Sequence, residues 1–293
     1  MITPATTRVP RVAAIHDLSC FGRCALSVIM PTLSVMGLQC VPLPTALFST
    51  HTGGFTGMHF VDLSDSMEGI ADHFETLPLT FDAIYSGFLG SARQIGIVSD
   101  FIDRFRGEGQ SRARVMVDPV MGDDGKLYST YTDELQAGMR RLCEKADIIT
   151  PNLTEACFLT GSPWCDTSAM SAVQAETYAG ELAKKMAVFG ASQIVITGVP
   201  FGDRIGTYVL DASAGRASTF FYHVHHQPKS FPGTGDIFAS VLLGALMRGD
   251  ALTDATRAAA DFVGEVIAYS QVCGEPTRDG VLLEPMLLKL AKR

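Results

Sequence analysis

Gly233, Thr234, Gly235 and Asp236 form the strongest chemical motif of the sequence, and they open an almost wholly apolar segment that reads as a helix. Glycines let backbone N–H groups approach an anion closely, and the positive end of a helix dipole favours negative charge. The motif predicts phosphoryl transfer, in which backbone donors hold the transferring group and Asp236 takes the proton of an attacking hydroxyl. The structural alternative is a glycine-rich turn with an Asp that suits the helix dipole.

Two further carboxylates follow predicted strands. Asp118 ends the strand 114–118 and precedes a Pro/Gly turn, where a cation or a water network could be held. A simple turn Asp is the alternative. Glu155 follows the strand 147–150 and could reach Mg²⁺, directly or through water. Asn152 and Glu155 also have the spacing of a capping box, which needs no metal.

Polar residues follow two more of the predicted strands. Thr197 and Gly198 come at the end of one, where a hydroxyl and a flexible turn could contact nucleotide phosphates. Asp17 and Ser19 come directly after the first strand of the chain. Because ligands bind at the carboxyl ends of the strands in open α/β sheets, all these side chains are candidates for one site.

Histidines offer weaker signals. His51 lies in the Gly-rich segment 49–57, which could act as a flap over a substrate, and its ring could contact a polar ring. A lone His is more often structural. His223, His225 and His226 look like a metal cluster, but no fourth ligand of convincing spacing is evident, so we interpret them as non-metal.

The elements that must position these residues alternate between β-branched runs and helical patterns. Strands are predicted over 11–16, 40–46, 81–87, 114–118, 147–150, 193–197, 204–211 and 217–224. Helices are predicted over 25–37, 67–77, 92–105, 132–145, 168–189, 235–248 and 253–270, with a short one closing the chain. Pro31 is expected to kink or end the first helix. The last two strands read as an antiparallel extension.

This alternation predicts a doubly wound, mainly parallel sheet with helices on both faces. No linker or repeat divides the 293 residues, so we expect one domain over 1–293.

Composition excludes several classes of protein. Apolar residues make up 47% of the chain and charged residues 18%, which excludes disordered and fibrous chains. The net charge is −8 and no run of Lys and Arg occurs, so we expect no nucleic acid or acidic membrane as partner. Seven scattered cysteines, no long apolar run and no apolar leader in the N-terminal MITPATTRVPRVAAIHD favour a cytoplasmic protein.

Five motifs follow predicted strands in a fixed order. They are SGFLGSARQI (86–95), VDPVMGDDGKLY (117–128), TPNLTEACFLTG (150–161), VITG (195–198) and PGTGDIFAS (232–240). In content and order they resemble the bacterial pyridoxal/pyridoxamine kinases of the ribokinase-like superfamily. The resemblance runs from about residue 11 to about residue 270. A single Gly-x-Gly-Asp is a weak signal, whereas five motifs in this order are a strong one.

The resemblance implies an ATP-dependent kinase, ordinarily a homodimer, that phosphorylates the 5′-hydroxymethyl group of pyridoxal, pyridoxine or pyridoxamine with Mg²⁺; use of a monovalent cation is left open. Matching positions give Asp236 as the base and Gly233, Thr234 and Gly235 as the anion hole. The residues expected around ATP are Asp118, Tyr128, Thr150, Asn152, Glu155, Thr197 and Gly198, with Asp118 and Glu155 at the metal. The residues expected around the vitamin are Asp17, Ser19, His51, Thr52 and Phe88.

Two sites in the sequence differ from the usual pattern of these kinases, and a third, Asp236, distinguishes pyridoxal kinases from hydroxymethylpyrimidine kinases. Asp17 stands where these kinases usually have Ser, and Ala25-Leu26 stands where Gly-Asn is common. Asp17 is similar to the early Gly-Ser-Asp of hydroxymethylpyrimidine kinases, but those relatives usually carry Cys at the position of Asp236. We therefore favour a pyridoxal or pyridoxamine kinase. The alternatives are a hydroxymethylpyrimidine kinase of thiamine synthesis, another small-alcohol kinase of the superfamily, or a non-catalytic B6-binding protein.

Overall fold

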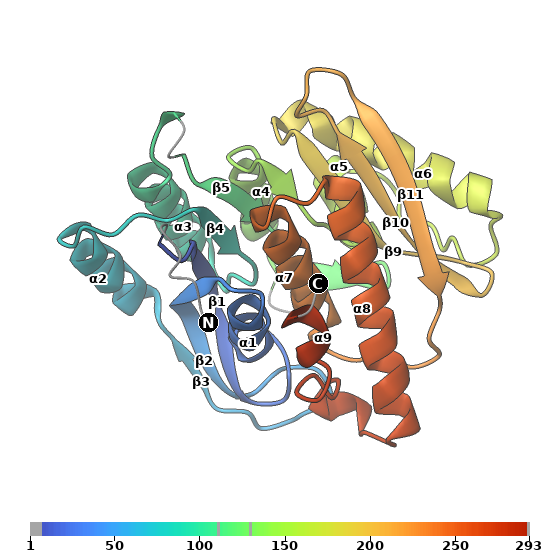
Figure 1. The fold of residues 1–293 in the computed structure, drawn as a ribbon, viewed down its shortest axis with the longest axis horizontal. Helices are drawn as coiled ribbons and strands as arrows, with labels where there is room; N and C mark the ends of the chain where they lie inside the picture. Colours follow the sequence, from blue (N-terminus) through green and yellow to red (C-terminus); the bar gives the residue numbers. More distant parts are fainter. Residues whose placement is uncertain (1–7, 110–111, 129–130, 292–293) are drawn as a thin grey trace, which may run out of the picture.

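A nine-stranded mixed sheet forms the centre of the computed structural model, which describes residues 8–109, 112–128 and 131–291 (Figure 1). The strand order is β11-β10-β9-β8-β5-β4-β1-β2-β3. The strands are β1 (Arg11–Phe21), β2 (Gln39–Thr50), β3 (Phe60–Asp62), β4 (Ala83–Ser86), β5 (Arg114–Val117), β8 (Ile148–Ile149), β9 (Gln193–Phe201), β10 (Arg204–Asp211) and β11 (Ser218–His225). A separate small hairpin consists of β6 (Gly122–Asp123) and β7 (Lys126–Leu127).

Helices cover both faces of the sheet, as predicted. One face carries α2 (Ser64–Glu75), α3 (Ala92–Phe105), α4 (Asp133–Cys143), α5 (Leu153–Thr160) and α6 (Ala172–Met186). The other carries α1 (Leu26–Val35), α7 (Thr234–Met247), α8 (Leu252–Val272) and α9 (Leu288–Ala291). Short 3₁₀ turns cover Ala187–Phe189 and Thr277–Asp279.

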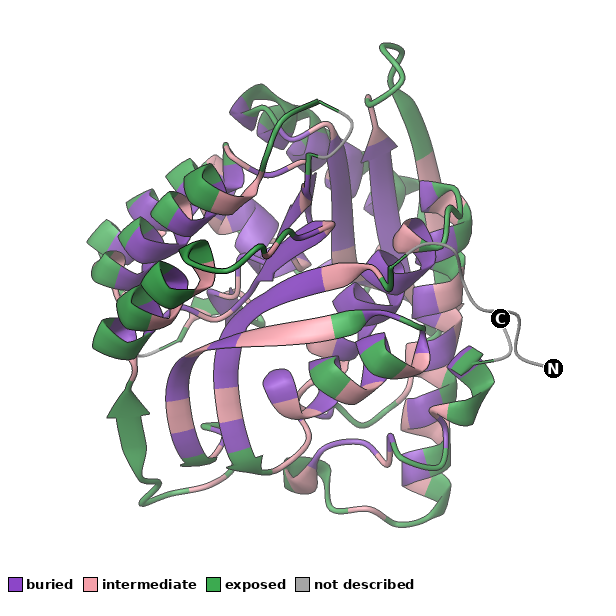
Figure 2. Ribbon diagram, turned by 60° about the vertical axis from the view of Figure 1, so that its left-hand side comes forward, coloured by how far each residue is buried: buried purple, intermediate pink, exposed green. Residues whose placement is uncertain are grey.

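Successive side chains along each strand point to opposite faces of the sheet, so they contribute to two hydrophobic cores, one on each side. In β1, Ala13 and Ile15 enter the core beneath α2–α6, whereas Val12 and Ala14 enter the core beneath α1 and α7–α9. All four are buried, and buried residues run through the central strands in Figure 2. The continuous apolar runs seen in the sequence therefore reflect strands that are covered on both faces.

The sheet changes its winding direction between β1 and β4. From β1 the chain builds outward to β2 on one side and to β4, β5, β8 and β9 on the other, all in parallel. Ligands bind beyond the carboxyl ends of the strands at such a switch point. β10 and β11 extend the sheet in antiparallel, as predicted.

Several predicted boundaries were wrong for identifiable reasons. β1 runs to Phe21, so Asp17 and Ser19 lie inside the strand, with a register shift between His16 and Leu18. The shift marks a bulge, which period-2 patterning does not reveal. Pro31 lies inside α1 without ending it.

Other differences concern the start of α6 and three short strands. The helix predicted over 168–189 begins only at Ala172, because Ser171 caps it. The strand β3 and the hairpin β6–β7 were not predicted. Asp124 and Gly125 have positive φ at the tip of that hairpin, so the Asp-Gly dipeptide was the available signal.

Among the described helices, none combines the length and the apolar character needed to cross a membrane. Residues 1–7, the first part of the N-terminal segment in which we expected no leader, lie outside the described residues.

Candidate active site

The start of α7 has an uncapped first turn behind a glycine of positive φ. Gly233 precedes the helix with φ +78°, and a Cβ there would lie 2.1 Å from the carbonyl oxygen of Arg23, so only glycine fits. No side chain caps the first turn of this helix, which leaves its N–H groups available to a ligand. Thr234 donates its hydroxyl back to the Phe231 carbonyl at 3.1 Å and so fixes the turn.

Asp236 lies in the first turn of α7, half-buried, beside these donors. Its Oδ2 accepts a hydrogen bond from the backbone N–H of Ala25 at 2.8 Å. Burial raises the pKa of Asp236 to about 6, and the Ala25 hydrogen bond opposes that rise. Burial is the larger of these two effects, and it brings the pKa of Asp236 near neutrality, where a general base works best.

Ala25 was not among the predicted site residues, but its backbone N–H contacts Asp236. Its φ of 50° and ψ of −137° lie in a region that L-residues other than glycine rarely occupy. The position is commonly Gly in the resembling kinases, which was the available signal. The strained backbone points the N–H of Ala25 at Asp236.

Asp17 lies at the β1 bulge, on the winding switch point and close to Asp236. Its Oδ2 accepts the hydroxyl of Ser19 at 3.3 Å. Burial, and then the negative charge of Asp236, raises the pKa of Asp17 to about 7. Two carboxylates thus share this part of the site, with no ion pair to a Lys or Arg among the described residues.

Asp118 follows β5 and is buried, with its N–H donating to the Ser86 carbonyl at 2.8 Å. Burial, and then the charges of Glu155 and Asp236, raises the pKa of Asp118 well above its usual range. Thr150 follows the neighbouring strand β8 and is also buried. Burial, and then the charge of Glu155, likewise raises the pKa of Tyr128. These residues therefore share one negative environment.

Asn152 and Glu155 form the capping box that their spacing predicted. The Asn152 side chain accepts the N–H of Glu155 at 2.9 Å, and Glu155 Oε2 accepts the N–H of Asn152 at 2.8 Å. The other oxygen, Oε1, accepts the N–H of Met121 at 3.0 Å. Burial nevertheless raises the pKa of Glu155 to about 8. Glu155 thus ties the turn after Asp118 to α5.

A divalent cation carried by a nucleotide fits this donor set. Asp118 and Glu155 are buried carboxylates that have no ion-pair partner among the described residues. Within the same residues no group of three or more His, Cys, Asp or Glu could hold a metal. Mg²⁺ is ordinarily bound by one or two carboxylates together with substrate phosphates. The residues fit a metal shared with a substrate and do not form a complete protein cage.

Replacement of Glu155 by Gln separates its two roles. A carboxamide has one acceptor oxygen where the carboxylate has two, so one backbone N–H loses its partner and the free energy of unfolding should fall by about 1–3 kcal/mol. If Glu155 also supports the metal, the Mg²⁺ concentration giving half-maximal rate should rise, and we expect this. Unaltered Mg²⁺ dependence in a Mg²⁺ titration would leave Glu155 as a helix cap only.

Thr197 and Gly198 lie inside β9, which continues past the predicted end at 197 to Phe201. The N–H of Thr197 donates to the Pro151 carbonyl at 2.9 Å, and Thr197 forms an isolated bridge with Asn152. Gly198 has φ +66°. The fold thus places both residues beside the start of α5.

His51 directly follows β2 and is held by the backbone. The N–H of Gly53 donates to Nδ1 at 3.0 Å, so Nε2 carries the proton and donates to the Arg278 carbonyl at 2.6 Å. Both ring nitrogens are thus engaged, which favours a structural role over contact with a substrate ring. The next residue, Thr52, is exposed. Phe88 is half-buried, with its ring 6.2 Å from that of Phe48.

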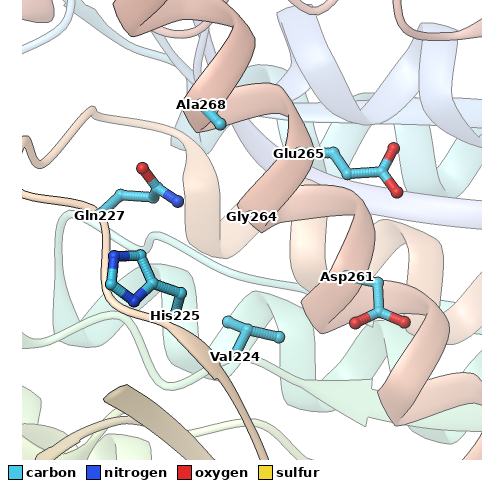
Figure 3. A pocket seen from close by; sticks show the side chains of 7 residues that line it. All are labelled: Val224, His225, Gln227, Asp261, Gly264, Glu265 and Ala268. Carbon is cyan, nitrogen blue, oxygen red and sulfur yellow. The ribbon is translucent and has the colours of Figure 1, made fainter. Parts of the chain in front are cut away.

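A surface pocket of about 290 Å³ opens between the end of β11 and α8 (Figure 3). β11 runs in the same direction as β9, so His225 at its end lies at the carboxyl edge of the sheet. From there the chain passes through Gln227, which also lines the pocket, to Gly233. On the helix side the lining residues are Asp261, Gly264, Glu265 and Ala268.

Comparison with known proteins identifies the family. The profile of the phosphomethylpyrimidine kinase family matches residues 30–278. A pyridoxal kinase of Arabidopsis thaliana is 30% identical over 74% of this chain and 68% of its own length.

Solved structures agree with this match. A Bacteroides thetaiotaomicron protein named as a candidate phosphomethylpyrimidine kinase, solved with pyridoxal, has a TM-score of 0.86 and 39% identity, covering 97% of this chain and 96% of that one. The pyridoxal kinase of Lactobacillus plantarum has a TM-score of 0.85 and 30% identity, covering 97% and 98%. The resemblance to pyridoxal kinases and the doubly wound fold are confirmed. The chain is a kinase that belongs to the phosphomethylpyrimidine kinase family.

Proposed function

We propose that this protein transfers the γ-phosphoryl group of ATP to the 5′-hydroxymethyl group of pyridoxal, pyridoxine or pyridoxamine, a step of vitamin B6 salvage. The observation that carries the proposal is the placement of Asp236. Its carboxylate lies beside the uncapped start of α7 and has a pKa of about 6. A protein that only bound the vitamin would have no use for a base next to an anion hole.

In this proposal the backbone N–H groups of Gly233, Thr234 and Gly235 hold the charge that develops on the transferring phosphoryl group. Asp236 accepts the proton of the vitamin hydroxyl as the new P–O bond forms. Mg²⁺, held between Asp118, Glu155 and the phosphates, would neutralise charge on the nucleotide. Thr150, Asn152, Thr197, Gly198 and Tyr128 would surround the remaining phosphates.

The two substrates would approach from opposite sides of Asp236. The pocket beside His225 suits the nucleoside of ATP, because it lies at the carboxyl edge of the sheet and its loop leads directly to Gly233. The vitamin would lie on the side of Asp17 and Ser19, with Thr52 and Phe88 on its wall. We place His51 behind this wall, where it fixes the loop.

The second candidate is a hydroxymethylpyrimidine kinase. It is favoured by the family profile and by Asp17, whereas Asp236 stands where such relatives usually have Cys. A panel of the three B6 vitamers and hydroxymethylpyrimidine, each with Mg²⁺-ATP, decides between them. We expect the highest kcat/KM with a B6 vitamer. Turnover of hydroxymethylpyrimidine alone would overturn the proposal, and binding without turnover would indicate a non-catalytic B6-binding protein.

Asp17 should make the enzyme accept an amine-bearing vitamer at least as well as pyridoxal. An ionised carboxylate facing the 4′ substituent would attract the cationic aminomethyl group by about 1–2 kcal/mol, roughly tenfold in specificity. Because the pKa of Asp17 is about 7, this preference should grow as the pH rises from 6 to 8. The measurement is the ratio of kcat/KM for pyridoxamine to that for pyridoxal. If the ratio is the same in Asp17→Ser as in the parent, Asp17 does not select the substrate.

We also propose a homodimer located in the cytoplasm. The edge strand β3 exposes Phe60 and Val61, with exposed Met58 just before it. An exposed apolar edge of this kind is unfavourable in water, and packing against a second copy of the chain would bury it. Sedimentation equilibrium would show a mass of twice the 31.4 kDa of one chain.

A further inference from the structure

Arg23 lies where three distant parts of the chain meet. A Cβ on Gly233 would come within 2.1 Å of the Arg23 carbonyl oxygen, and a Cβ on Gly280 within 2.7 Å of the Arg23 Cβ. Both glycines have positive φ. The backbone of Arg23 therefore runs between the turn that opens α7 and the segment that follows α8, with no room for a side chain on either of the two glycines.

The side chain of Arg23 fastens this arrangement. Its Nη1 donates to Glu275 Oε1 and its Nε to Glu284 Oε1, both at 2.8 Å. Its backbone N–H donates to the Asp279 carbonyl at 3.1 Å. All three partners belong to the segment after α8. One arginine thus ties the connection between β1 and α1 to residues near the other end of the chain.

Ala25, two residues later, has the strained backbone that donates to Asp236. Strain of this kind persists only where the surroundings over-determine the conformation. The fixed points next to Ala25 on its N-terminal side are the contacts of Arg23. A second fixed point is Ser27 in the first turn of α1, whose hydroxyl donates to the Cys24 carbonyl at 2.7 Å. This bond ties the connection to α1, whereas the contacts of Arg23 tie it to the segment after α8.

We propose that Arg23 is a positioning residue, which acts through Ala25 to keep the proton-accepting carboxylate of Asp236 hydrogen-bonded and correctly placed. The proposal rests on the proposed kinase function. The Arg23 side chain is 27% exposed and that of Glu275 19%, so this pair is partly buried and its loss also costs some stability. The effect that distinguishes a positioning role is the one on the chemistry at Asp236.

The fall of kcat/KM at acidic pH, the acidic limb of its pH profile, reports the protonation of Asp236 and is therefore the measurement that responds to its placement. The ionisable groups that face Asp236 are Asp17 on β1, Cys24 before α1, Tyr85 on β4, Asp118 after β5 and Tyr128 after β7. Of these, Asp17 has a pKa near that of Asp236. Profiles should therefore be measured both in the parent and in an Asp17→Asn background, where the limb reports Asp236 without Asp17.

The test is Arg23→Gln. Without its anchors, Ala25 relaxes, Asp236 loses a hydrogen-bond donor to its ionised form, and its pKa rises. We expect the acidic limb of kcat/KM to move up by about one pH unit, which is a loss of about fivefold at pH 6, about tenfold at pH 5 and little loss at pH 8.5. Glycine adopts the conformation of residue 25 without strain, so Arg23→Gln/Ala25→Gly should recover the parent profile.

Arg104→Gln is the matched control. Arg104 also pairs with two carboxylates, Asp72 and Glu75, and its side chain is 26% exposed against 27% for Arg23, but it lies between α2 and α3, away from Asp236. The Arg104→Gln variant should show the same acidic limb of kcat/KM as the parent. An unmoved limb in Arg23→Gln, or a moved limb that Ala25→Gly does not restore, would overturn the proposal.

Hydrogen exchange at the Ala25 amide tests the same idea without any substrate. The amide should exchange faster in Arg23→Gln than in the parent or in Arg104→Gln, at equal thermal stability. If the parent does not phosphorylate a vitamer but this exchange changes as expected, the kinase proposal fails and the positioning of Asp236 by Arg23 stands. Unchanged exchange in an active enzyme contradicts the role of Arg23 alone.

Discussion

Asp236→Asn should lower kcat by about 10²–10⁴-fold, the range expected for loss of a positioned general base. A primary alcohol is a poor nucleophile at neutral pH, so its proton must leave as the P–O bond forms. Asn keeps the size of the side chain, and its carboxamide oxygen can still accept the N–H of Ala25, but it cannot take up a proton. Steady-state kinetics at saturating ATP and vitamer measure the effect.

The pH profile adds an independent check on Asp236. With a pKa of about 6, the parent carboxylate is protonated as the pH falls through 6, so kcat/KM should decline there. In Asp236→Asn the part of this decline that belongs to Asp236 should vanish. ATP affinity should not fall, because the removed charge could only repel the γ-phosphate. Near-parent kcat in a folded variant would refute the role of Asp236, and a thermal melt excludes simple unfolding.

Gly233→Ala should damage both the fold and the reaction. Alanine at φ +78° costs about 1–2 kcal/mol, and its Cβ would lie 2.1 Å from a backbone oxygen, which cannot rotate away as a side chain could. Overpacking of this kind adds about 1–3 kcal/mol. Relief of the clash must displace the first turn of α7, and loss of a positioned backbone donor costs about 10²–10³-fold in kcat.

Gly235→Ala is the matched control for Gly233. It lies in the same turn, and a Cβ there would meet nothing within 4 Å. Its thermal melt should match that of the parent, whereas the melt of Gly233→Ala should shift downward. Equal melts for the two variants would contradict the close approach of Gly233 to Arg23.

The parts of this molecule that the sequence predicted well are those with local signals. The parallel sheet follows from apolar runs that alternate with amphipathic helices, and the candidate carboxylates were found because each closes or follows a strand. The capping box of Asn152 and Glu155 needs only a spacing of three residues.

The parts that the sequence did not predict depend on distant contacts or on very short elements. The hydrogen bond from Ala25 to Asp236 joins residues 211 positions apart, and no periodicity reports such a pair. The bulge that draws Asp17 into β1 depends on its pairing with β2. The two-residue strands β6 and β7 are shorter than any pattern can resolve, although their Asp-Gly turn was visible.

The contacts of Arg23 with Glu275 and Glu284 also set the earliest time at which a chain under synthesis can become fully active. Its partner Glu275 is 252 residues further on. At a synthesis rate of about 5–20 residues per second, the ribosome needs about 13–50 s to cover that distance. Once β11 ends at His225, all nine strands of the sheet have been made, but the segment that anchors Arg23 has not. A nascent chain therefore carries Asp236 before it carries the contacts that hold its hydrogen-bond partner, and full activity should arrive only after Glu275 and Glu284 have been synthesised.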